Sequence, residues 1–140
     1  MFKVGIVGWR GMVGSVLIQR MHEENDFESI DANFFSTSQS GEKVNILNSQ
    51  GSSLLDAFDI DELIKMDILL SCQGGDYTKK ILNSLREKGW SGHWIDAAST
   101  LRMDSDAMIV LDPINKDAIN TAIKAGNKNW VGGNCTVSLM

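Results

Sequence analysis

The chain has 140 residues, a formal net charge of -5 and 43% hydrophobic residues, which suits one domain around a single core. Its excess of acidic over basic residues argues against a nucleic-acid partner, and no apolar run approaches the ~18 residues of a membrane span. Cys72 and Cys135 lack the spacing and the clustered histidines of a zinc site. We therefore expect no metal, free thiols and a cytoplasmic location.

Apolar runs alternate along the chain with segments of helical periodicity. The expected strands are 2–8, 31–38, 66–72, 93–99, 107–113 and 129–134. The expected helices are 11–24, 59–65, 75–89 and 115–126, and the polar segment 41–53 is expected to be a loop. The expected caps are Asp59 or Asp61, Asp76, Gly89 and Gly126. This alternation predicts an α/β fold with a doubly wound, mostly parallel sheet of the Rossmann type.

Gly8, Gly11 and Gly14 follow the first strand in "GWRGMVG", a G-x-x-G-x-x-G spacing. In the usual dinucleotide fingerprint, G-x-G-x-x-G, the first gap is one residue shorter. The position between a strand and a helix still favours dinucleotide binding. Glycine lets the backbone approach a pyrophosphate, and the start of the helix offers free N–H groups to it. A tight turn without a ligand is the alternative interpretation.

The second strand ends in three hydroxyl side chains, Ser36, Thr37 and Ser38. Proteins that bind NAD place a carboxylate here to accept the ribose 2′-hydroxyl. A 2′-phosphate would be repelled by a carboxylate but accepts hydrogen bonds from hydroxyls, and Arg10 in the glycine turn adds a nearby cation. These residues favour NADP over NAD as the cofactor, and the alternative is a polar strand end at the surface.

The third strand ends in "SCQGGDY", at the sheet edge where a cofactor is expected. Its glycine pair lets the backbone approach a ligand, and Gln73 can hydrogen-bond a ribose or a nicotinamide. A plain loop is the alternative. Cys72 ends a buried strand without an evident base, so we interpret it as a core residue.

Cys135 follows Gly-Gly-Asn and precedes an apolar run, which places it at the start of a helix. A helix N-terminus lowers a thiol pKa from its usual ~8.5, and its N–H groups can form an oxyanion hole. Cys135 is therefore a candidate nucleophile, with a buried structural cysteine as the alternative. Arg102, in a loop of small residues, can grip a carboxylate or phosphate, or is an ordinary surface arginine. We expect neither His22 nor His93 to be a catalytic base.

Five segments carry a resemblance to a known family. The segments "GIVGWRGMVGSVLIQRM", "FFSTSQ", "CQGGDYT", "WIDAASTLRM" and "GGNCTVSLM" closely resemble, in order, the aspartate-semialdehyde dehydrogenases of the Gram-negative bacterial type. The similarity runs from Met1 to Met140, but the family's proteins are considerably longer. The resemblance implies an NADP-binding domain over 1–134 and the start of the catalytic-cysteine helix over 135–140. It also implies that the family's second, α+β substrate and dimerisation domain is absent from this chain.

The resemblance implies reductive dephosphorylation of L-4-aspartyl phosphate to L-aspartate 4-semialdehyde. This reaction feeds lysine, diaminopimelate, methionine, threonine and isoleucine biosynthesis. Cys135 would form the acyl-thioester, and Arg102 would bind the phosphate of the substrate and later the phosphate ion. The implied cofactor contacts are Arg10, Gly11, Met12 and Val13 for the NADP phosphates, Thr37 and Ser38 for the 2′-phosphate ribose, and Gln73.

The family's histidine acid/base and second substrate arginine have no counterpart in this chain. We therefore expect the chain alone to bind NADP with little or no turnover, and the intact protein to be a homodimer. One rival hypothesis is another phosphorylating aldehyde dehydrogenase, for glyceraldehyde 3-phosphate or N-acetylglutamyl phosphate. The other is a non-catalytic dinucleotide-binding module.

Overall fold

The computed structural model of the chain describes residues 1–38, 41, 53–97, 101, 107–110 and 114–132. The strands are β1 (Phe2–Val7), β2 (Ile30–Ser36), β3 (Leu55–Asp56), β4 (Ile68–Ser71), β5 (His93–Asp96), β6 (Ala107–Val110) and β7 (Asn129–Gly132). The helices are α1 (Met12–Glu23), α2 (Ile60–Leu63), α3 (Gly75–Glu87) and α4 (Lys116–Lys124), with a 3₁₀ turn, η1 (Asp26–Glu28). None of the described helices is long and apolar enough to cross a membrane.

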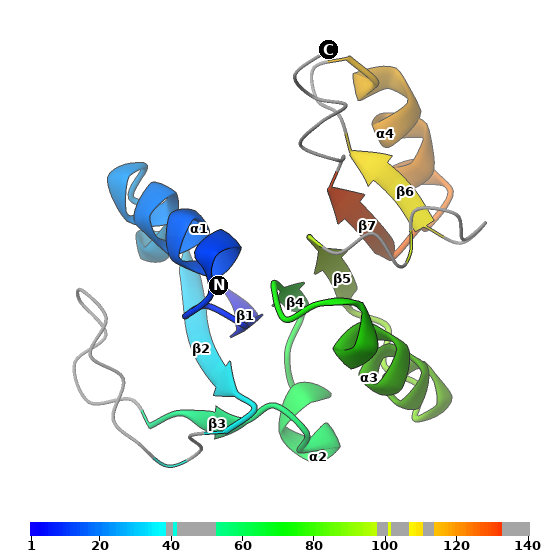
Figure 1. Ribbon diagram of the computed structural model, residues 1–140. Helices are drawn as coiled ribbons and strands as arrows, with labels where there is room; N and C mark the ends of the chain where they lie inside the picture. Colours follow the sequence, from blue (N-terminus) through cyan, green and yellow to red (C-terminus); the bar gives the residue numbers. More distant parts are fainter. Residues whose placement is uncertain (39–40, 42–52, 98–100, 102–106, 111–113, 133–140) are drawn as a thin grey trace.

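The strands form one sheet in the order β3-β2-β1-β4-β5-β7-β6 (Figure 1). Every pair of neighbours is parallel. From β1 the chain moves outward through β2 to β3, and then returns to the other side of β1 with β4. The strand order therefore reverses between β1 and β4, and the predicted doubly wound, parallel α/β sheet is confirmed.

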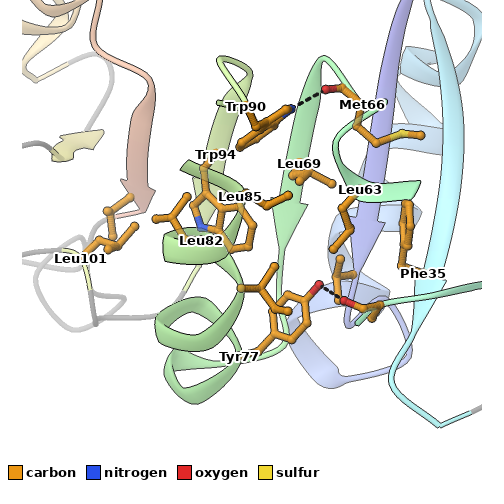
Figure 2. Packing of buried hydrophobic residues seen from close by; sticks show 14 residues of the cluster. Phe35, Leu63, Met66, Leu69, Tyr77, Leu82, Leu85, Trp90, Trp94 and Leu101 are labelled. Carbon is orange, nitrogen blue, oxygen red and sulfur yellow. Dashed lines mark hydrogen bonds between the residues drawn. The ribbon is translucent and has the colours of Figure 1, made fainter. Parts of the chain in front are cut away.

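Apolar side chains form a cluster on each face of the sheet, since successive side chains of a strand point to opposite sides. Val7 and Phe35 belong to the larger apolar cluster, whereas their neighbours Ile6 and Phe34 belong to a second cluster on the other side. Helices α2 and α3 contribute to the larger cluster, and α1 contributes to the second. Figure 2 shows the larger cluster, in which Trp90 donates its indole N–H to the carbonyl of Met66 at 2.8 Å.

Three of the expected helix caps are confirmed: Asp59, Gly89 and Gly126. The Asp59 carboxylate is the N-cap of α2 and accepts hydrogen bonds from the backbone N–H groups of Asp61 and Glu62. Helix α3 stops at Gly89, as expected from the sequence. The N–H of Trp90 then donates to the carbonyl of Leu85 at 3.0 Å, which satisfies a carbonyl that the end of the helix leaves without a helical partner. Gly126 follows the C-cap of α4 at φ +83°, and the N–H of Asn127 then donates to the carbonyl of Ala122 at 3.0 Å.

Two details of the expected elements are wrong. Asp76 is not the N-cap of α3, because the helix begins at Gly75 and the carbonyl of Gly74 already accepts from the N–H of Thr78 at 3.3 Å. Asp76 lies instead in the first turn, where its negative charge interacts favourably with the positive end of the helix dipole. The sheet also gains the two-residue strand β3, which is too short to give a periodic signal.

One face of the sheet carries an exposed apolar groove between α4 and strands β5, β6 and β7. Its volume is about 570 Å³, and its lining is mainly apolar. Ile95 on β5 is 38% exposed and Ile123 on α4 is 55% exposed. The lining residues are Ile68, His93, Ile95, Val110, Ile119, Ile123, Trp130, Val131 and Gly132.

Candidate functional site

A pocket lies where the strand order reverses, at the carboxyl ends of β1, β2 and β4. Its volume is about 400 Å³, and every lining residue belongs to one of the three segments that follow or end these strands. Open parallel sheets bind ligands at this place, because the loops on either side diverge and leave a crevice. The lining residues are Gly8, Trp9, Arg10, Gly11, Phe35, Ser36, Thr37, Ser38, Cys72 and Gln73.

The turn after β1 presses against the backbone at the end of β4. Gly8 has φ +76°, and a Cβ atom built on it would lie 2.6 Å from the carbonyl carbon of Cys72 and 2.7 Å from the nitrogen of Gln73. Only glycine adopts this conformation without strain and leaves the space empty. The turn and the segment 72–73 therefore form one continuous wall of the pocket.

Helix α1 begins directly at the pocket. Its N-cap is Gly11, which supplies no side-chain hydrogen bond, and no acidic residue lies in the first turn. A Cβ on Gly14 would lie 2.2 Å from the carbonyl oxygen of Gly8, so the helix packs directly on the turn. Backbone N–H groups without a side-chain cap, at the positive end of a helix, form a favourable site for an anionic group. Met12 and Val13 lie in this turn with their side chains exposed.

The segment after β2 provides hydroxyls and no carboxylate. Ser36, Thr37 and Ser38 all line the pocket, and the N–H of Ser38 donates to Oγ of Ser36 at 3.3 Å. Arg10 carries the only charge among the described lining residues. The structure therefore brings the three hydroxyl residues to the same pocket as Arg10. The positive charge of Arg10 and the hydroxyl donors suit an anionic ligand.

Cys72 is not the core residue that the sequence suggested. It is partly exposed and lines the pocket, because it directly follows β4 at the edge of the sheet where the pocket opens. Burial, and secondly the charge of Asp96, raise the pKa of the Cys72 thiol. The group therefore stays protonated at neutral pH, which is unfavourable for a nucleophile. The neighbouring Gln73 is exposed at the mouth of the pocket.

The structure also shows a buried carboxylate, Asp96, which the sequence analysis did not single out. It ends β5 at 1% exposure and accepts hydrogen bonds from the Thr78 hydroxyl on α3 and, at 3.2 Å, from the Trp94 indole. Beside it on β4, the buried hydroxyl of Ser71 has no hydrogen-bond partner in the part of the chain that the structure describes. The sequence signal that could have identified Asp96 is its position as a carboxylate at the end of an apolar strand.

Two predicted site residues, Arg102 and Cys135, lie outside the described residues. The strands that precede them, β5 and β7, are neighbours and end at the same edge of the sheet as the pocket. His93 starts β5 at the opposite edge and accepts from the Trp130 indole at 3.0 Å. Burial, and then Lys128 and Arg86, lower the pKa of His93. Neither His93 nor the partly exposed His22 lines the pocket.

The sequence matches an established protein family over most of its length. The family described as "Semialdehyde dehydrogenase, NAD binding domain" covers residues 3–122. The chain belongs to the semialdehyde dehydrogenase family. The matched part of that family is a domain that binds a nicotinamide dinucleotide.

Solved structures share the fold of this chain. An aspartate semialdehyde dehydrogenase from Francisella tularensis is 60% identical with a TM-score of 0.96, and the match covers 100% of this chain and 38% of that one. Aspartate semialdehyde dehydrogenase II from Vibrio cholerae, complexed with ASA, shares the fold at 23% identity and a TM-score of 0.77, over 99% of this chain and 43% of that one. An aspartate semialdehyde dehydrogenase with NADP from Candida albicans shares the fold at 16% identity and a TM-score of 0.64, over 99% and 44%. The chain thus spans less than half the length of these enzymes.

Replacing Gly14 with alanine tests the close packing of α1 on the turn. We expect Gly14→Ala to lower the free energy of unfolding by about 1–3 kcal/mol and to weaken dinucleotide binding, because the new methyl group overlaps the carbonyl of Gly8. The matched control for stability is Gly11→Ala, whose Cβ would meet its nearest atom at an ordinary 3.6 Å. Urea denaturation measures the stability of both variants, and ligand titration measures binding by Gly14→Ala. An equal loss of stability in the two variants would contradict the packing described.

The raised pKa of Cys72 predicts that its thiol is alkylated slowly. In a Cys135→Ser background, which leaves one cysteine, we expect iodoacetamide to modify Cys72 at pH 8 more slowly than it modifies an unstructured peptide thiol. The reason is that less thiolate is present when the pKa is raised. Mass spectrometry measures the rate, and unfolding in urea should remove the protection. A rate equal to that of the peptide would refute the shift.

Proposed function

We propose that the pocket binds NADP and that the chain is the cofactor-binding part of an aspartate-semialdehyde dehydrogenase. The observation that carries this proposal is the composition of the pocket at the reversal of the strand order. A glycine turn, the uncapped start of a helix, a cation and three hydroxyls converge there. Each of these groups suits part of a phosphorylated dinucleotide.

NADP is favoured over NAD by the groups that follow β2. Thr37 and Ser38 offer hydroxyls at the place where NAD-binding proteins place a carboxylate, and Arg10 lines the same pocket. A 2′-phosphate gains from the hydroxyls and from the guanidinium, whereas a plain 2′-hydroxyl gains little from the cation. The fold relative from Candida albicans was solved with NADP, which is consistent with this choice.

The remaining cofactor contacts follow from the turn and from β4. We assign the pyrophosphate to the N-terminal turn of α1, with the backbone N–H groups of Met12 and Val13 as donors. The N–H of Gly11 donates to the carbonyl of Gly8 at 3.3 Å, so Gly11 is assigned the close approach of the ligand to the backbone. Gln73, exposed at the pocket mouth, is assigned a hydrogen bond to the cofactor. In these roles Met12 and Val13 act through their backbone, which is compatible with exposed side chains.

The proposed substrate is L-4-aspartyl phosphate, reduced to L-aspartate 4-semialdehyde with release of phosphate. Support comes from the 60% identity to the Francisella tularensis aspartate semialdehyde dehydrogenase over the whole of this chain. The Vibrio cholerae enzyme of the same fold was solved with ASA bound. The reaction would serve lysine, diaminopimelate, methionine, threonine and isoleucine biosynthesis in the cytoplasm.

Cys135 and Arg102 are assigned the chemistry, on the strength of their sequence context and the resemblance. The Cys135 thiolate attacks the acyl carbon, the phosphate leaves with the electrons of the broken C–O bond, and the acyl group is held as a thioester. Arg102 neutralises the phosphate as it leaves. NADPH, when bound in the pocket, would supply a hydride for reduction of the acyl group. The Cys135 sulfur departs as thiolate when the aldehyde is released.

We assign residues 1–134 to a cofactor domain and residues 135–140 to the start of the nucleophile's helix. Because the chain spans 38% of the Francisella tularensis enzyme, we propose that a longer protein carries the full activity, as a homodimer. The chain by itself binds NADP with little or no turnover, since it lacks the acid/base histidine that the resemblance implies for the complete enzyme.

Exchanging the hydroxyls for a carboxylate tests the assignment of NADP. We expect Thr37→Asp with Ser38→Ala to weaken NADP binding at least about tenfold, because a carboxylate beside the 2′-phosphate repels it. NAD binding should weaken much less or improve. Isothermal titration with each dinucleotide measures the ratio, and Ser53→Ala, an exposed serine outside the pocket lining, serves as control. An unchanged NADP-to-NAD ratio would remove these residues from the site.

Removing the thiol of Cys135 separates chemistry from cofactor binding. In the longer enzyme, Cys135→Ser should reduce acyl transfer by several orders of magnitude, because an alkoxide is far harder to form at neutral pH than a thiolate. NADP affinity should stay within about twofold, which is below 0.5 kcal/mol. The assays are phosphate release and titration with NADP. Retained turnover would exclude Cys135 as nucleophile, and lost NADP binding would indicate a structural role.

A further inference from the structure

Trp9, which no role above uses, lies between the core and the pocket. Its ring meets Phe34 of β2 edge to face, with ring centroids 5.7 Å apart and planes at 69°. Phe34 is itself buried in the second apolar cluster, at 2% exposure. The indole is therefore held in place from the core side, while Trp9 still lines the pocket.

The guanidinium of Arg10 lies over this indole. Its central carbon is 4.7 Å from the centroid of the Trp9 ring, within the range of a cation–π contact. Arginine has many rotamers and loses side-chain entropy when it is fixed. An exposed Arg10 without a platform would lose that freedom only when a ligand binds, at the expense of affinity.

A guanidinium that stacks on an aromatic ring can still form hydrogen bonds. A guanidinium contacts an aromatic ring through its face, and its N–H groups point outward in its own plane, where they can grip a phosphate. Strands β1 and β2 are neighbours, with Val7 opposite Phe35. Arg10 after β1 and the hydroxyls after β2 accordingly line the same pocket.

The indole N–H of Trp9 has no acceptor among the described residues, unlike those of the other three tryptophans. Trp90 donates to the carbonyl of Met66, Trp94 to Asp96 and Trp130 to His93. The contribution of Trp9 is therefore its ring surface and not an indole hydrogen bond. A phenyl ring can reproduce that contribution in part, whereas an aliphatic side chain cannot.

We propose that Trp9 is a positioning residue that selects NADP, because its ring holds Arg10 where the guanidinium meets the 2′-phosphate. This inference rests on the proposed binding of NADP in the same pocket. It adds that the preference for NADP over NAD depends on an aromatic face at position 9, through Arg10. The effect is specific to the 2′-phosphate, since NAD lacks the group that Arg10 would bind.

The test is isothermal titration of the 140-residue chain with NADP and with NAD, for the wild type and for Trp9→Phe, Trp9→Leu and Trp9→Met. We expect Trp9→Leu to lower the NADP-to-NAD affinity ratio about two- to fivefold, and Trp9→Phe to keep it within about twofold, as an exposed cation–π contact implies. Trp9→Met fills the volume without an aromatic face, and it replaces Trp9→Leu if circular dichroism shows that the latter does not fold.

A double-mutant cycle with Arg10→Met separates positioning from packing. In the Arg10→Met background, Trp9→Leu should leave the affinity ratio unchanged, because the group that the ring positions is gone. An equal loss of NADP and NAD affinity, or the same fall in the ratio with and without Arg10, would overturn the proposal. An unchanged ratio in Trp9→Leu, with a wild type that prefers NADP, overturns this inference alone. A wild type that binds neither dinucleotide overturns the proposed function with it.

Discussion

The close approach of the Gly8 turn to the backbone at the end of β4 sets the geometry of the whole site. A side chain at position 8 would overlap the carbonyl carbon of Cys72, so the two segments meet as bare backbone. This contact lies where the strand order reverses, and it fixes the direction in which α1 leaves the sheet. The open start of that helix, and the pocket beside it, follow from one residue that has no Cβ.

Electrostatics then decides what such a pocket can hold. The glycines alone would accept any phosphate-bearing ligand, since they offer only space and N–H groups. Selectivity has to come from side chains at the rim, and in the function proposed for this pocket those are the guanidinium of Arg10, which stacks on Trp9, and the hydroxyls after β2. The proposed site thus joins a general anion-binding backbone to a small number of side chains that would distinguish one dinucleotide from another.

Much of this was accessible from the sequence because its signals are local. Parallel strands bury both faces and appear in the sequence as continuous apolar runs. Because their carboxyl ends meet at one edge of the sheet, the sequence was enough to predict that Arg10, Thr37 and Gln73 lie at the same pocket. The partial exposure of Cys72 and the burial of Asp96 could not be predicted, because each depends on packing between segments that are distant in the sequence. Asp96 is tolerated in the interior only because Thr78, eighteen positions earlier on α3, and Trp94 supply hydrogen bonds to it.

The apolar groove beside α4 affects the behaviour of the chain in solution. Isoleucines of β5 and α4 are exposed there, on the face of the sheet opposite α3. Exposed apolar surface of this kind favours association between molecules. The net charge of -5 opposes it, because like-charged molecules repel one another. Colloidal stability of the chain is thus a balance that added salt shifts toward association, by screening the repulsion while leaving the apolar attraction in place.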